Sequence, residues 1–121
     1  MSKGVQVSTT NGVSVITLDE RYKSINETEI PALQTTVLEA VDSADPPHVV
    51  FDLKNVEFFG SSFIEILFRM WNRLNQKSNG RFAICGLTEY CLEVIQVTNL
   101  DKLWQLCDTV EQAVDQLSSD N

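Results

Sequence analysis

The sequence holds little of what metal sites, disulfide frameworks and hydrolytic centres are built from. It has 1 histidine and 3 cysteines in 121 residues. Cys85, Cys91 and Cys107 are odd in number and form no Cys-x-x-Cys pair, so we expect free thiols in the core of a protein from a reducing compartment. His48 alone lacks the convergent partners that a metal site or Ser-His catalysis needs. The sequence therefore predicts no metal, no cofactor and no enzymatic activity.

Positive charge and long apolar runs are also scarce. The chain has 9 lysines and arginines against 17 aspartates and glutamates, a formal net charge of -8. Nucleic-acid-binding domains carry basic stripes and anionic membranes attract basic segments, so both partners are disfavoured. No stretch approaches the roughly 20 apolar residues that span a bilayer, and no signal-peptide pattern follows residues 1–4. We expect a cytoplasmic protein that binds neither nucleic acid nor membrane.

The N-terminal segment has the pattern of a β-hairpin. Residues 5–10 and 13–18 are rich in valine, isoleucine and threonine, and Asn11-Gly12 between them is the strongest short hairpin signal. The ordinary apolar content of 43% in a chain of this length indicates one domain over residues 1–121, with 118–121 as a frayed tail.

Helices and short strands alternate after this hairpin. Four segments carry apolar residues at helical spacing, and three apolar segments are too short to be helices. The expected helices cover residues 30–41, 61–74 (or 62–74), 88–95 and 109–117, and the expected strands cover 48–53, 81–85 and 103–107. This order predicts an α/β fold: a mixed, mostly parallel β-sheet opened by an antiparallel hairpin and covered by about four α-helices.

The junction between the strand 48–53 and the next helix is the most informative part of the chain. A buried strand leads through a short loop into Ser61 and Ser62 at the start of an amphipathic helix. The first N–H groups of a helix lack intrahelical partners, and the macrodipole is positive there. A serine in this place either caps the helix or, as a phosphoacceptor, sets a phosphate among those N–H groups. Ser62 and Glu65 have the spacing of a capping box, so we expect Ser62 to cap the helix.

The same junction resembles the STAS domain family, which sulphate transporters and anti-sigma factor antagonists share. The family pattern is an apolar strand ending in Asp-Leu, a spaced valine, an aromatic or apolar pair, and a serine pair that opens a helix. The matching landmarks are Asp52-Leu53, Val56, Phe58-Phe59, Ser61-Ser62, Gly86-Leu87 and Thr98-Asn99-Leu100. The resemblance extends over most of the chain and implies a STAS-like fold of the anti-sigma factor antagonist branch.

This resemblance also implies a mechanism. Carried over by position, the phosphoacceptor is Ser61. The implied partner is an anti-sigma factor that is itself a serine kinase, an ATPase of the histidine-kinase-like fold. It binds the unphosphorylated chain and releases the phosphorylated one, and a serine phosphatase resets the switch. The sequence leaves the oligomeric state open.

Two positions depart from the family pattern. Gly60 stands where the family has an acidic residue before the serines, and Phe63 stands where it has a glycine. We expect Phe63 to be exposed or half-buried and to contact a partner, with Asp52 and Arg69 as further candidate contacts. Asp52 either orients the Ser61 loop or accepts backbone N–H bonds. We also expect one or two aromatic side chains to lie exposed near the helix that Ser61 begins.

Two other classes of function remain open at this stage. A STAS scaffold or sensor domain that is not phosphorylated would bind a small ligand, a nucleotide or a protein partner. A small hydrolase would need a base close to Ser61, and the sequence offers no recognisable one. Phosphate on Ser61 after contact with a kinase and ATP separates the first interpretation from both of these.

Overall fold

The structure is a computed structural model that describes residues 4–118, and its centre is a five-stranded sheet in the order β1-β2-β3-β4-β5. The strands are β1 (Val5–Thr10), β2 (Val13–Leu18), β3 (His48–Asp52), β4 (Arg81–Cys85) and β5 (Gln105–Cys107). β1 pairs with β2 antiparallel, and every other neighbouring pair is parallel. The predicted mixed sheet with an opening hairpin is confirmed.

The turn between β1 and β2 explains why the chain opens with a hairpin. Asn11 and Gly12 have φ values of 52° and 79°. A two-residue turn that matches the twist of its strands needs positive φ at both positions, and asparagine and glycine tolerate this best. The register pairs Thr10 with Val13, directly across the turn.

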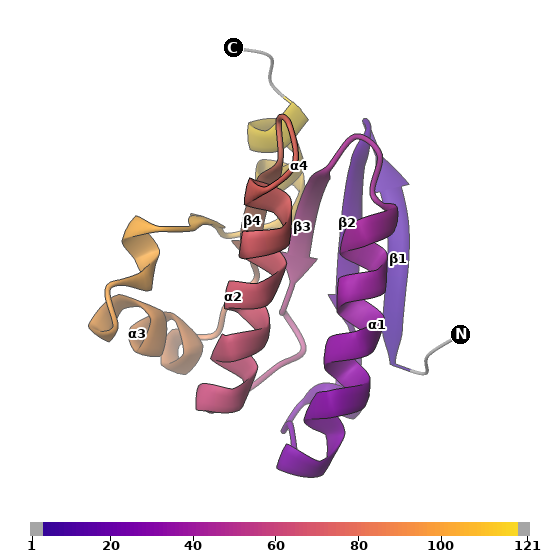
Figure 1. Cartoon of the computed structure of the whole chain (residues 1–121). Helices are drawn as coiled ribbons and strands as arrows, with labels where there is room; N and C mark the ends of the chain where they lie inside the picture. Colours follow the sequence, from indigo (N-terminus) through magenta and orange to yellow (C-terminus); the bar gives the residue numbers. More distant parts are fainter. Residues whose placement is uncertain (1–3, 119–121) are drawn as a thin grey trace.

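Helices cover both faces of the sheet (Figure 1). They are α1 (Ile30–Ser43), α2 (Ser61–Asn75), α3 (Glu89–Val97) and α4 (Val110–Ser118), joined by 3-10 turns η1 (Glu20–Tyr22), η2 (Glu27–Glu29) and η3 (Leu100–Lys102). α1 and α2 lie side by side on one face and α4 lies on the other, while α3 and η3 lie in the connection from β4 to β5. None of the helices within residues 4–118 has the length and apolar character that a bilayer crossing requires.

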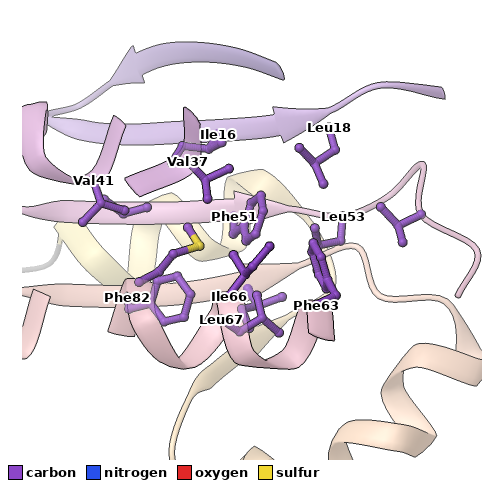
Figure 2. Packing of buried hydrophobic residues seen from close by; sticks show 14 of the residues in the cluster. Ile16, Leu18, Val37, Val41, Phe51, Leu53, Phe63, Ile66, Leu67 and Phe82 are labelled. Carbon is purple, nitrogen blue, oxygen red and sulfur yellow. The ribbon is translucent and has the colours of Figure 1, made fainter. Parts of the chain in front are cut away.

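The central strand β3 is buried on both faces, as its apolar run predicts. Phe51 belongs to the core on the α1 and α2 side, and Val50 to the core on the α4 side. Figure 2 shows Phe63, Ile66 and Leu67 of α2 pointing toward Phe51. Burial of such a side chain contributes roughly 1.5–3 kcal/mol. The start of α2 is therefore fixed to the sheet by its own first turn.

The ends of some elements differ from the prediction. α2 ends at Asn75, one residue beyond the expected end, and the left-handed Asn79 lies in the turn that leads into β4. Thr109 accepts the N–H of Gln112 at 3.1 Å, but the Gln112 amide oxygen accepts the N–H of Asp108. The two bonds resemble a capping box whose return bond comes from the N–H of Asp108 and not from that of Thr109. Of the expected frayed tail 118–121, residues 119–121 lie outside the described residues.

The three cysteines are free thiols. Cys85 and Cys91 are buried, and Cys107 is partly buried. Burial, and after it the negative charge of Asp52, raises the pKa of the Cys85 thiol to about 12. A thiol that stays protonated at neutral pH is a poor nucleophile, so Cys85 is a core residue.

Candidate functional site

Ser61 is the first residue of α2 and its side chain is exposed. Gly60 precedes it as the N-cap, with φ −107° and ψ −170°, and its carbonyl accepts the N–H groups of Phe63 at 3.1 Å and Ile64 at 3.2 Å. Within residues 4–118, no hydrogen bond or ion pair engages the Ser61 hydroxyl, and the N–H groups of Ser61 and Ser62 have no acceptor. The hydroxyl therefore stands free beside two unpaired amide donors.

Backbone hydrogen bonds and an aromatic contact fix the loop before α2. The Val56 N–H donates to the Leu53 carbonyl at 3.0 Å, and the Glu57 N–H donates to the Lys23 carbonyl at 2.9 Å. Phe59 then turns inward and stacks on Phe63, with 5.0 Å between the ring centroids. In the sequence, Phe59 precedes the serine pair and Phe63 follows it. Because both rings are packed in the core, they fix the backbone that carries the Ser61 hydroxyl.

The predicted capping box of Ser62 and Glu65 is wrong. The Ser62 hydroxyl donates to Glu27 Oε1 at 2.9 Å, and Glu65 instead pairs with Arg69 at 3.3 Å. The reason is the register of the helix start. Gly60 is the N-cap, so the third helical position is Phe63, which has no acceptor to return a bond.

Glu27 is a site residue that sequence reasoning missed. It lies in η2, just before α1, and brings its carboxylate to the N-terminus of α2. A negative charge there is favoured by the helix macrodipole. Glu27 thus brings a negative charge to the helix start, where Gly60 has none. No local signal marks it, because 35 residues separate it from Ser62.

The expected exposure of Phe63 is wrong. Its ring is 1% exposed and lies 5.9 Å from the Phe51 ring, so it cannot touch a docked protein. Helical periodicity already places it on the stripe that faces the sheet. Phe63 is therefore a supporting residue beneath the Ser61 hydroxyl.

The other two candidate contacts separate in the structure. Asp52 is 2% exposed and accepts the N–H of Lys54 at 3.1 Å, so it is not a surface contact. Acceptance of a backbone N–H by Asp52 is observed, and its orientation of the Ser61 loop stays a prediction. Arg69 is exposed one turn into α2 from Glu65, and its contact with a partner stays a prediction.

Gly60→Asp is expected to stabilise the fold by about 0.5 kcal/mol, because an aspartate at the N-cap accepts a free N–H and suits the macrodipole. The backbone at Gly60 is extended, and an added Cβ would meet nothing within 4 Å. The measurement is urea denaturation. Gly60→Ala is the matched control and gains no acceptor, so it should not stabilise. Destabilisation by aspartate would show that the Glu27 carboxylate already satisfies this helix end.

Comparison with known proteins gives one consistent result. The family model for the STAS domain matches residues 4–113. A solved STAS domain protein from Planctomyces limnophilus, described as an anti-sigma-factor antagonist, is 39% identical over 95% of this chain and 98% of its own, with a TM-score of 0.89. A solved anti-sigma factor antagonist from Mycobacterium paratuberculosis is 29% identical over 95% of this chain and 93% of its own, with a TM-score of 0.79.

A curated relative agrees with these structures. The anti-sigma F factor antagonist of Paenibacillus polymyxa is 27% identical over 79 residues, which make up 65% of this chain and 67% of the relative. The family match extends from the first described residue into α4 and includes the serine-bearing start of α2. The chain therefore belongs to the STAS domain family and has the fold of the anti-sigma factor antagonists.

Proposed function

We propose that this chain is a cytoplasmic partner-switching regulator that works by binding and is switched at Ser61. The unphosphorylated form binds an anti-sigma factor that is a serine kinase of the histidine-kinase-like ATPase fold. The kinase transfers the γ-phosphoryl group of ATP to Ser61 Oγ, so that the serine loses its hydroxyl proton and ADP leaves. The phosphorylated chain is released, and a serine phosphatase returns it to the binding form by hydrolysis.

The observation that carries this proposal is the free Ser61 hydroxyl. It is exposed at the first position of α2, and no group within residues 4–118 engages it. A kinase can therefore reach it without unfolding the helix. Once attached, a phosphate of about −1.5 to −2 charges lies where free amide N–H groups and the macrodipole favour an anion. These features support a phosphate at this position.

The relatives support the same interpretation. The two solved structures with the identities given above and the curated protein are all described as anti-sigma factor antagonists. Glu27 also supports it, since it restores a negative charge beside the serines where Gly60 lacks one. The departures at positions 60 and 63 thus leave the acceptor itself intact.

Ser61→Ala is expected to abolish phosphorylation. The chain should be incubated with ATP and, one at a time, each purified serine kinase of this ATPase fold from the genome that encodes it. Intact mass of the wild type should rise by about 80 Da, the mass of one phosphoryl group. The alanine variant should gain nothing, because the acceptor oxygen is gone.

Ser62→Ala is the matched control, and it should still gain one phosphoryl group. It removes the neighbouring hydroxyl and its bond to Glu27 while leaving Ser61 exposed. Phosphorylation of the Ser61→Ala variant would show that the acceptor is another residue. If no kinase modifies the wild type, a STAS scaffold that binds without phosphorylation becomes the better interpretation.

A further inference from the structure

Two exposed aromatic side chains lie against each other close to Ser61. Phe58 is 47% exposed and Tyr90 is 55% exposed. Their ring centroids are 6.4 Å apart with an interplanar angle of 84°, an edge-to-face contact. We call Phe58 and Tyr90 the aromatic pair. Apolar rings left in water cost free energy, so an exposed cluster of this kind indicates a surface that a partner covers.

Hydrogen bonds join the two distant segments that carry the aromatic pair. Phe58 lies in the loop before α2, and Tyr90 lies in the first turn of α3. The Thr88 hydroxyl donates to the Glu57 carbonyl at 3.1 Å, and the Cys91 thiol donates to the same carbonyl at 3.5 Å. These two bonds tie α3 to the loop on either side of Tyr90. Pre-ordered aromatic anchors lose little entropy when a partner binds, which is typical of binding hot spots.

The border of the aromatic pair is acidic. Glu57, Glu89 and Glu93 are exposed beside it on the loop and on α3. The cations on this side are Lys23, which pairs with Glu57 at 3.6 Å, and Lys54, which pairs with Asp52 at 3.9 Å. An exposed pair of this kind contributes little and does not reverse the local charge. A complementary surface must therefore offer an apolar socket bordered by lysine or arginine.

We infer that the aromatic pair is the docking surface for the kinase, which inserts it into an apolar socket bordered by basic residues. This inference rests on the proposed function and names the surface that function uses. The position of the aromatic pair also favours the kinase as its partner, since Phe58 precedes the phosphoacceptor Ser61 by only three residues. A kinase that brings ATP to Ser61 covers the ring beside it. The acidic border steers that encounter, so binding weakens as salt is raised.

The test measures kinase affinity by calorimetry for single variants, with the same set of purified kinases. Phe58→Ala and Tyr90→Ala are each expected to weaken binding by about tenfold or more. Val97→Ala is the matched control, because Val97 is 74% exposed at the far end of the same helix, and its affinity should not change. Glu89→Lys should weaken binding, and this loss should shrink at high salt. Thermal unfolding confirms that each variant is folded.

The outcomes separate this inference from the proposed function. If a kinase binds and phosphorylates Ser61 but tolerates both alanine variants, the docking surface lies elsewhere and the proposed function stands. If the variants change the self-association of the chain in sedimentation and leave kinase affinity unchanged, the aromatic pair joins two copies and the inference is wrong. If no kinase binds the wild type at all, both the function and the surface fall.

Discussion

Phe63→Ala is expected to lower the free energy of unfolding by about 3–5 kcal/mol, the usual loss for a buried phenylalanine. The ring is 1% exposed and lies between the rings of Phe51 and Phe59. Alanine removes the ring from the point where the first turn of α2 meets β3, and the rigid sheet cannot close the cavity. Urea denaturation measures the change, and an unaltered slope would place the effect in the folded state.

Phe58→Ala is the matched control for this prediction. It removes the same side chain five residues earlier, but from a position that is 47% exposed. Its expected loss is below about 1 kcal/mol, because surface substitutions leave little cavity. Equal losses from the two variants would contradict the assignment of one ring to the core and the other to the surface. The two variants also distinguish two roles: Phe63→Ala removes packing beneath Ser61, and Phe58→Ala removes a surface that a partner could contact.

Most of the fold could be predicted from the sequence because its signals are local. Asn11-Gly12 determines the hairpin, because few residue pairs tolerate two positive φ values in succession. The apolar run of β3 is too short for a helix and is buried on both faces, as parallel strands are. Thr88 accepts the N–H of Cys91 and begins α3 at the predicted residue. Each of these features depends only on neighbours in the chain.

The candidate site was less predictable because its bonds are not local. The N-cap is Gly60, two residues before the expected cap Ser62, so Phe63 and not Glu65 occupies the third helical position and the capping box disappears. Ser62 then pairs with Glu27, which no pattern in the sequence connects to it. For Phe63, helical periodicity predicts a side chain that faces the sheet, whereas the glycine of the family pattern suggests an exposed position. The structure follows the periodicity.

The aromatic residues show the same limit. The sequence predicts one or two exposed rings near the start of α2, and Phe58 confirms this. Nothing local decides between Phe58 and Phe59, because neighbours in an extended loop point in opposite directions and either could face the core. No sequence pattern marks Tyr90, because its contact with Phe58 exists only once α3 packs beside the loop.

Phosphorylation of Ser61 is expected to weaken kinase binding by about 100-fold or more, equivalent to about 2.7 kcal/mol. A kinase that covers Phe58 also covers Ser61, so a phosphate there must be buried in the interface. The helix N–H groups reach only part of the phosphate, and removing water from its remaining oxygens costs several kcal/mol. Isothermal calorimetry with the enzymatically phosphorylated chain measures the change. Ser61→Asn is the neutral control for Ser61→Asp, and only the aspartate should lose much affinity.

The salt dependence of kinase binding shows whether the phosphate weakens it by desolvation or by charge repulsion. Glu27, Glu57 and Glu89 make this side of the chain acidic, so its partner surface is expected to be basic and cannot act by repelling the phosphate. The loss must then come from desolvation of the buried phosphate. Screening shortens electrostatic reach to about 3 Å at 1 M salt, but it does not remove a desolvation penalty. The ratio of the kinase affinity of the unphosphorylated chain to that of the phosphorylated chain should therefore persist from about 0.1 M to about 1 M salt. A ratio that falls toward one would assign the switch to repulsion between surfaces and would contradict the basic socket inferred for the kinase.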